Sequence, residues 1–161
     1  MLGTTLTAML NKIISGGQTG VDRAALDVAL ARGISSGGWC PRGRLAEDGR
    51  IPGRYPLTET PSRRYRERTE WNVRDADGTL IFATGKLTGG TRLTKHFAEQ
   101  FGKPVFRVDF ADPPSADWLW EQLLADQIQV LNIAGPREST EPDIYQKTVD
   151  YLHRLLDAKN A

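Results

Sequence analysis

Two glycine-rich segments of the chain carry the residue types that bind phosphate. The first is Gly16-Gly17-Gln18-Thr19-Gly20, and the second is TGKLTGGT at residues 84–91. Because glycine lacks a Cβ, a backbone rich in it can turn its N–H groups toward one point and admit an anion closely. A helix that begins directly after such a segment adds unpaired N–H donors and the positive end of its dipole. Together the two segments predict a phosphate site.

Hydroxyl, amide and cationic side chains near these segments complete the predicted binding set. The hydroxyls of Thr19 and Thr91 can each cap a helix or donate to an oxyanion. Arg68 and Asn72 are four residues apart, hence on one side of a helix, and can face the site together. The full predicted set is Gly16, Gly17, Gln18, Thr19, Gly20, Arg23, Arg42, Arg44, Arg68, Asn72, Lys86, Thr88, Gly89, Gly90 and Thr91.

The two segments differ from the common nucleotide-binding motifs. Neither ends in the Gly-Lys-Ser/Thr of the ATPase phosphate loop, and neither is a full GxGxxG. Routine ATP hydrolysis and hydride transfer are therefore disfavoured. Gly17 is expected to serve the approach of the ligand, so that Gly17→Val would abolish binding with little effect on folding.

Three acidic residues near the segments each have two interpretations. Asp22, in the first turn of a helix, is a partner of the helix dipole, worth roughly 0.3–1 kcal/mol. Alternatively, Asp22 accepts a hydrogen bond from a ligand hydroxyl or ring nitrogen. Glu47 and Asp48 are solvated carboxylates of a glycine-rich loop, or they form an acid–base pair.

Three other features are also open to two interpretations. Trp39 with Arg42 and Arg44 can stack a planar ring and pair with phosphate, or the tryptophan is buried between surface arginines. Cys40 is interpreted as a small buried hydrophobic residue in preference to a reactive thiol. The segment Gly135-Pro136-Arg137 follows a strand as the other two segments do, and an ordinary turn is the favoured interpretation.

Alternating strand and helix signals must position these residues. Apolar periodicity and glycine or proline breaks predict strands at 12–15, 37–40, 79–83, 104–110 and 129–134 and helices at 19–32, 65–76, 91–100, 115–125 and 141–158. Such alternation predicts a three-layer α/β domain with a mostly parallel sheet of about five or more strands and helices on both faces. Since parallel strands end at one edge, the glycine segments gather there.

The chain is expected to form one domain. Residues 1–11 are predicted to be a flexible leader, and residues 12–161 a single ligand-binding domain. The segment 35–62 is rich in glycine, proline and arginine, and an ordered excursion of this length is often functional.

Composition excludes several classes of protein. A net charge of +1 argues against a protein that coats nucleic acid or an anionic membrane. No stretch approaches the roughly 20 apolar residues that span a bilayer, so a cytoplasmic location is expected. Cys40 is the single cysteine, which excludes an internal disulfide and a cysteine-based zinc site. The two histidines are too few to form a histidine metal cluster, so the sequence predicts no metal ligands. No catalytic residue is predicted either.

Four stretches, in order, resemble the molybdenum-cofactor carrier family. They are IISGGQTGVDRAALDVA at 13–29, GGWCPRGRLAEDGRIP at 37–52, RTEWNVRDADGTLIF at 68–82 and GGTRLTKHFAEQFGKPV at 89–105. The family is a circularly permuted branch of the Rossmann-like superfamily that includes the lysine-decarboxylase-like phosphoribohydrolases. The resemblance implies a Rossmann-like fold, self-association as a dimer or tetramer, and a phosphorylated pterin or nucleotide-like ligand.

The resemblance also implies roles for individual residues. Gly16 to Gly20 and Gly89 to Thr91 would hold the phosphate or the molybdenum oxo end of molybdenum cofactor (molybdopterin), with Arg42 and Arg44 closing over it. Relatives that hydrolyse nucleotides carry a glutamate shortly after a Pro-Gly-Gly-x-Gly-Thr loop, whereas Arg92-Leu93-Thr94 stands here.

The expectation is therefore a binding or carrier protein that passes its cofactor to a molybdoenzyme, without itself ligating the metal. The alternative is an enzyme or sensor that acts on a nucleotide derivative, with Asp22 or Glu47 as the acid–base group.

Overall fold

A computed structural model describes residues 9–158 of the chain. Most of the leader predicted at residues 1–11 lies outside this range. Its last part is described, and Leu10 there is buried in the main hydrophobic core. The core of the domain thus includes a residue before position 12.

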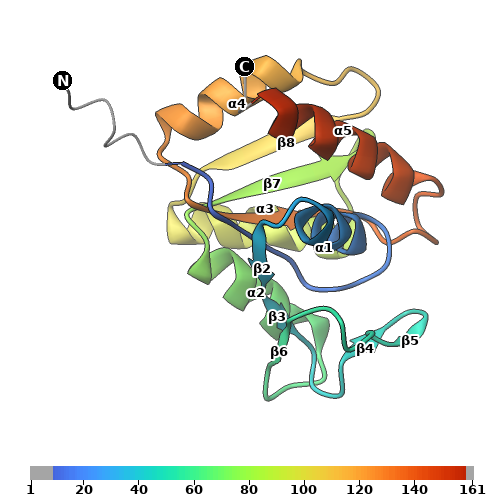
Figure 1. The fold of residues 1–161 in the computed structure, drawn as a ribbon. Coiled ribbons are helices and arrows are strands. Elements are labelled where there is room, and N and C mark those ends of the chain that lie inside the picture. The colour runs from blue at the N-terminus through green and yellow to red at the C-terminus, as the bar shows by residue number, and fades with distance from the viewer. Residues whose placement is uncertain (1–8, 159–161) are drawn as a thin grey trace.

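The centre of the molecule is a five-stranded parallel sheet (Figure 1). Its strand order is β2 (Ser35–Gly37), β1 (Lys12–Ile14), β9 (Val130–Ala134), β7 (Gly78–Ala83) and β8 (Val105–Asp109). The C-terminal strand β9 is inserted between β1 and β7 and pairs parallel to both. Strands β1, β9 and β7 therefore form the middle of the sheet, and their carboxyl ends lie side by side at one edge.

Within residues 9–158, five helices cover the two faces of the sheet, so the fold is the predicted three-layer α/β, Rossmann-like architecture (Figure 1). One face carries α1 (Val21–Ala31), α4 (Ala116–Ala125) and α5 (Ile144–Ala158), which pack on one another. The other face carries α2 (Tyr65–Asp75) and α3 (Gly89–Phe101), which also pack together.

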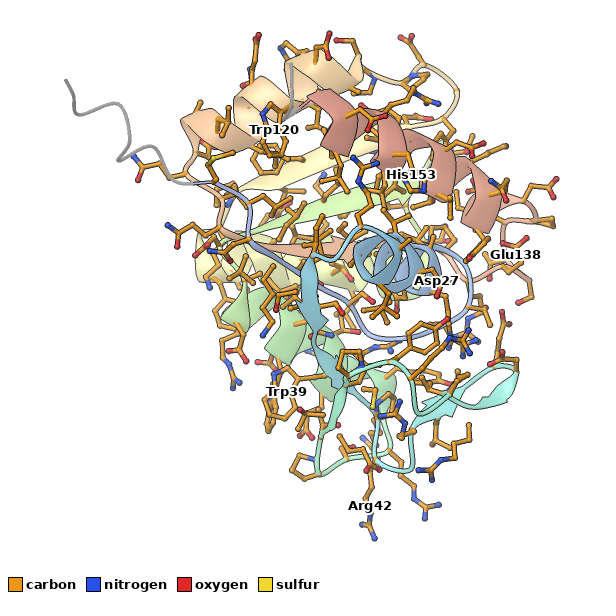
Figure 2. The ribbon with its side chains drawn as sticks, in the orientation of Figure 1. Asp27, Trp39, Arg42, Trp120, Glu138 and His153 are labelled. Atoms are coloured by element: carbon orange, nitrogen blue, oxygen red, sulfur yellow. The ribbon has the colours of Figure 1, made fainter. Side chains whose placement is uncertain are left out.

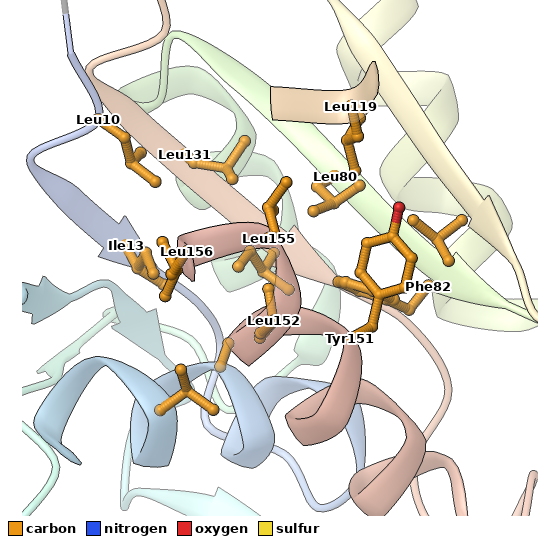
Figure 3. Packing of buried hydrophobic residues seen from close by; sticks show 14 of the residues in the cluster. Leu10, Ile13, Leu80, Phe82, Leu119, Leu131, Tyr151, Leu152, Leu155 and Leu156 are labelled. Carbon is orange, nitrogen blue, oxygen red and sulfur yellow. The ribbon is translucent and has the colours of Figure 1, made fainter. Parts of the chain in front are cut away.

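The main hydrophobic core lies between the sheet and α1, α4 and α5 (Figure 3). Leu80 and Phe82 of β7 are two residues apart, so both side chains point to this face, where Phe82 contacts the Tyr151 ring edge-on at 5.6 Å. Full burial of each large apolar side chain contributes about 1.5–3 kcal/mol. On the other face a smaller cluster contains Val73 of α2 and Phe97 of α3.

The excursion at 35–62 contains more structure than the sequence predicts. The single strand expected at 37–40 is two strands, β2 in the main sheet and β3 (Trp39–Cys40), which pairs with β6 (Thr58–Glu59). Gly38 separates them with a φ of 126°, and a Cβ at this position would lie 2.2 Å from the Ser15 carbonyl oxygen. The chain therefore leaves the sheet at the one residue type that tolerates both conditions. A hairpin of β4 (Leu45–Ala46) and β5 (Gly49–Arg50) follows.

Candidate functional site

The segments that follow β1, β7 and β9 meet around one cleft of about 470 Å³ at the carboxyl edge of the sheet. They contribute Gly16 and Gln18, then Thr84 with residues 86–91, and then Gly135, Pro136 and Arg137. Residues 135–137, for which an ordinary turn was the favoured interpretation, form one wall of the cleft. The topology explains why, since β9 lies between the other two strands.

The cleft brings together one part of the predicted binding set. These residues line it: Gly16, Gln18, Arg68, Asn72, Lys86, Thr88, Gly89, Gly90 and Thr91. Arg68 and Asn72 enter it from the same side of α2, as their spacing predicts. Five of the other predicted residues serve contacts within the protein, namely Gly17, Thr19, Gly20, Arg23 and Arg44, and the sixth, Arg42, is exposed outside the cleft.

The amino-terminal end of α3 presents backbone N–H donors to the cleft. Thr88 is its N-cap residue; within residues 9–158 no side chain caps this end, and the first turn has no acidic residue. Gly89 has a φ of 52°, which suits glycine, and the buried Thr91 faces the cleft from the first turn. Unpaired N–H groups and the helix dipole together favour an anion here.

The prediction that Thr19 or Thr91 caps a helix is wrong. Helix α1 begins after Gly20, which occupies the N-cap position with a φ of 80°, and Thr91 lies inside α3. The Thr19 hydroxyl instead accepts a hydrogen bond from the Glu138 backbone N–H at 3.2 Å. Thr19 thus joins the segment after β1 to the segment after β9.

Asp22 and Arg68 form a buried pair of opposite charges in the wall of the cleft. Asp22 Oδ2 accepts a hydrogen bond from the Gln18 backbone N–H at 3.1 Å, and Arg68 Nη1 donates to the Gly16 carbonyl at 2.8 Å. The closest approach of guanidinium and carboxylate is 4.0 Å. Burial raises the pKa of Asp22, opposed by the nearby Arg68, and burial lowers the pKa of Arg68.

Gln18 has a fixed side-chain orientation. Its Oε1 accepts hydrogen bonds from the backbone N–H groups of Thr19, at 3.1 Å, and Glu47, at 2.8 Å. These two donors identify the amide oxygen, which leaves Nε2 enclosed and without a partner in the described part of the chain.

Arg23 lies beneath the first glycine segment rather than in the cleft. Its Nε donates to the Gly17 carbonyl at 2.9 Å, and its two Nη atoms bind both oxygens of Asp48. The side-chain bonds from Arg23 lower the pKa of Asp48. Arg23, which was predicted to bind a ligand phosphate, thus forms an ion pair with Asp48 of the β4–β5 hairpin instead.

Gly17 is also required by the protein's own packing. It has a φ of 80°, and a Cβ would lie 2.5 Å from Leu57 Cδ1 and 2.9 Å from Ile51 Cδ1. This geometry argues against the expectation that Gly17→Val would spare folding, because the positive φ strains any residue with a Cβ. At Gly20, which also has a positive φ, a Cβ would lie 2.5 Å from the Pro136 carbonyl oxygen.

Glu47 holds two of the cleft segments together. Its carboxylate accepts hydrogen bonds from the hydroxyls of Thr19 and Ser139, and these bonds lower the pKa of Glu47. Glu47 and Asp48 are exposed, as the favoured interpretation has it, yet each is bound to a partner rather than merely solvated. They lie outside the lining of the cleft, which gives no support to the acid–base alternative.

Arg44 organises the excursion instead of closing over a ligand. Its buried guanidinium donates to the carbonyls of Ile51, Pro52 and Tyr55 at 2.7–3.1 Å and to that of Leu57 at 3.3 Å. Arg42 is exposed at the outer tip of the excursion (Figure 2). The predicted closure of these two arginines over a ligand is not seen. The guanidinium of Arg44 is bound to backbone carbonyls, and Arg42 points away from the cleft (Figure 2).

Trp39 and Cys40 also belong to the packing of the excursion. Trp39 Nε1 donates to Asp75 at 2.7 Å, and its ring meets that of Trp71 edge-on with 4.7 Å between the ring centroids. Trp39 therefore packs against α2, and neither interpretation of this tryptophan describes that position. Cys40 is fully buried with Ile51 and other apolar side chains, as expected, and burial raises the pKa of its thiol.

Two charged residues of the cleft were missed from the sequence. Arg137 lines the cleft and lies over the Tyr65 ring, 5.4 Å from its centroid. Glu141 accepts hydrogen bonds from the backbone N–H and hydroxyl of Thr84, at 3.1 and 2.7 Å, and so ties the second glycine segment to the third. The segment after β9 ends at the same edge of the sheet as the two glycine segments, and this shared edge is the signal that could have found both residues.

Residues 9–158 contain neither a metal centre nor a membrane-spanning helix. Within them no three His, Cys, Asp or Glu side chains cluster closely enough to hold a metal ion. In the same residues no helix combines the length and apolarity needed to cross a membrane.

Comparison with known proteins gives a consistent result. The sequence profile of the circularly permutated YpsA SLOG family matches residues 13–156. A crystal structure described as a "putative molybdenum carrier protein" from Syntrophus aciditrophicus SB is 49% identical in sequence, with a TM-score of 0.87. The match covers 96% of this chain and 99% of that one. No curated protein matches the chain.

Proposed function

The chain belongs to the circularly permutated YpsA SLOG family, and from this premise we propose that it binds and carries a phosphorylated small molecule in the cleft. Molybdenum cofactor is the ligand that we name. The observation that carries the proposal is the convergence of three glycine-bearing segments on one cleft of about 470 Å³. Small-molecule sites in proteins have volumes of this order.

The phosphate is proposed to lie at the start of α3. Thr88, Gly89, Gly90 and Thr91 line the cleft there, and the first turn offers N–H groups with no acidic side chain among the described residues. Lys86 precedes this turn and Arg137 lies in the wall formed by the segment after β9. Backbone donors supply directional hydrogen bonds, and the two cations add attraction at longer range.

The organic part of the ligand is proposed to extend toward Asp22, Arg68 and Asn132. These polar side chains are buried and line the same cleft. The choice of molybdenum cofactor is supported by the crystal structure described above, which is named a molybdenum carrier and whose sequence is 49% identical to this chain over 96% of its length. Self-association as a dimer or tetramer and delivery to a molybdoenzyme remain part of the proposal.

The second candidate is an enzyme that acts on a nucleotide derivative. The observation in its favour is the buried Asp22, whose pKa is raised by burial and which faces the cleft. Against it, Arg92, Leu93 and Thr94 follow the second glycine segment at the positions where hydrolytic relatives carry a glutamate.

A parallel binding and turnover experiment tests the proposal. The purified protein is incubated with molybdenum cofactor and, separately, with nucleoside monophosphates, while the midpoint of thermal unfolding and the release of free base are measured. Carriage predicts a raised midpoint with the cofactor and no product with the nucleotides. Release of free base would favour the enzyme, and an unchanged midpoint with every phosphorylated compound would contradict a phosphate site in the cleft.

A further inference from the structure

Asp22 and Arg68 are held close together but are not bonded to each other. Their side chains are 9% and 10% exposed, and the nearest nitrogen and oxygen are 4.0 Å apart, which exceeds a hydrogen bond. By contrast, Arg23 and Asp48 make two direct bonds although Asp48 is half-exposed. A buried ion pair gains most from direct contact, so the gap at Asp22 requires a cause.

The first glycine segment is that cause. The Gln18 backbone N–H binds Asp22 Oδ2, and the Gly16 carbonyl accepts from Arg68 Nη1. Asp22 Oδ2 and Arg68 Nη1, the two atoms nearest to each other, are thus each bound to the backbone of this segment. What remains is Asp22 Oδ1, an acceptor, and Arg68 Nη2, a donor, each without a partner among residues 9–158.

These two remaining atoms are accessible. Enclosed polar atoms that lack a partner in the described chain are Gln18 Nε2 and Thr148 Oγ1, and neither Asp22 Oδ1 nor Arg68 Nη2 is among them. Both residues line the cleft, which is the side from which a ligand would meet these atoms. Because the two side chains are only 9% and 10% exposed, little water can solvate these atoms, which favours a ligand group that satisfies both.

We propose that Asp22 and Arg68 form a subsite for a neutral group that both donates and accepts hydrogen bonds, at the end of the ligand remote from its phosphate. A sugar diol has this chemistry, and so does the N–H and C=O edge of a heterocyclic ring. A second anionic group is excluded, since it would face the Asp22 carboxylate. This inference rests on the proposed function and specifies which half of the ligand each part of the cleft selects.

Calorimetric titration with four probes tests the subsite on the full chain. Inorganic phosphate has the anion alone, and methyl phosphate adds an apolar group. Ribose 5-phosphate adds a diol, and 2′,3′-dideoxyguanosine 5′-monophosphate adds a ring edge without the diol. The wild-type protein is expected to bind at least one of the last two about tenfold or more tightly than methyl phosphate. Which of the two binds identifies the source of the donor–acceptor group.

The matched variants are Asp22→Asn and Asp48→Asn. Each keeps the shape of the side chain and removes one charge beside an arginine, but only Asp22 lines the cleft. Asp22→Asn is expected to reduce the affinity ratio between the preferred probe and methyl phosphate about tenfold, whereas Asp48→Asn leaves the ratio unchanged. Using a ratio removes the general effect of the lost charge on anion binding.

The outcomes separate the two proposals. A wild-type protein that binds methyl phosphate as tightly as both larger probes has no such subsite, and this result does not depend on any variant. An Asp22→Asn variant with an unchanged ratio would also overturn the inference while leaving the phosphate site intact. If no probe binds, including inorganic phosphate, the proposed function itself fails and the subsite with it.

Discussion

The guanidinium of Arg23 binds both carboxylate oxygens of Asp48, at 2.8 and 2.9 Å, while its Nε donates to the Gly17 carbonyl. This one side chain connects α1, the segment after β1 and the β4–β5 hairpin. The arginine is 11% exposed and the aspartate 49%. Because their burial differs, loss of the two partners should have different consequences.

Arg23→Met should lower the free energy of unfolding by about 2–4 kcal/mol, since it leaves the Gly17 carbonyl and Asp48 without their donor. Asp48→Asn should lower the free energy of unfolding by about 1 kcal/mol or less. The carboxylate is half-exposed, so its ion pair with Arg23 contributes little, and the amide of asparagine can still accept one hydrogen bond. Urea unfolding followed by circular dichroism measures both. Equal losses in the two variants would show that the bond to Gly17 contributes little.

Glu47 gives the stability of the protein a dependence on pH. Hydrogen bonds from Ser139 and Thr19 hold its pKa below the ordinary value of 4.5. Since the pKa is lower in the folded state, the stabilisation is fully present above the unfolded pKa and is lost as pH falls through the folded pKa. Glu47→Gln should therefore narrow the difference in stability between pH 6 and pH 3. Urea midpoints measured across this range for both proteins provide the test, and parallel curves would contradict it.

The fold was predictable because its signals are local. Apolar periodicity located each helix to within a few residues, and alternation of strand and helix implied the parallel sheet. The topology required more, because no local signal says that β9 is inserted between β1 and β7. That insertion is what makes Arg137 and Glu141 neighbours of the second glycine segment.

The parts of the candidate site that are formed by backbone could be predicted from the sequence, and most of the side-chain contacts could not. Glycine segments at strand ends gave the location of the cleft. Arg23 and Arg44 were expected in the cleft but bind the protein's own oxygens, because a cation is equally suited to these and to a ligand phosphate. Arg44 bonds to four carbonyls of the excursion, contacts that link it to residues up to 13 positions away and leave no pattern in the sequence.

Gly17 and Gly33 provide a matched pair for the role of packing against the first glycine segment. Both have a positive φ, 80° and 67°, but a Cβ meets Leu57 and Ile51 at position 17 and nothing within 4 Å at position 33. Each alanine variant should cost about 1 kcal/mol from backbone strain. Gly17→Ala should cost a further 1–2 kcal/mol or so from overpacking. Equal unfolding free energies for the two variants would show that the excursion adapts to the added methyl group.

Gly90 offers the most direct test of the anion site at the start of α3. It lines the cleft with a helical backbone, and a Cβ there meets nothing within 4 Å, so Gly90→Val should fold normally. The side chain would nonetheless stand beside the N–H groups proposed to bind phosphate, and we expect at least a roughly tenfold loss of affinity for inorganic phosphate, equivalent to about 1.4 kcal/mol.

Gly53→Val is the control for this variant. Gly53 also has open space around its Cβ position and no positive φ, but it lies in the excursion, outside the lining of the cleft. Calorimetric titration with phosphate should give wild-type affinity for Gly53→Val. Because both variants add the same side chain to an uncrowded glycine, a loss shared by both would reflect a general effect of valine on the fold. Retained affinity in Gly90→Val would place the anion away from α3.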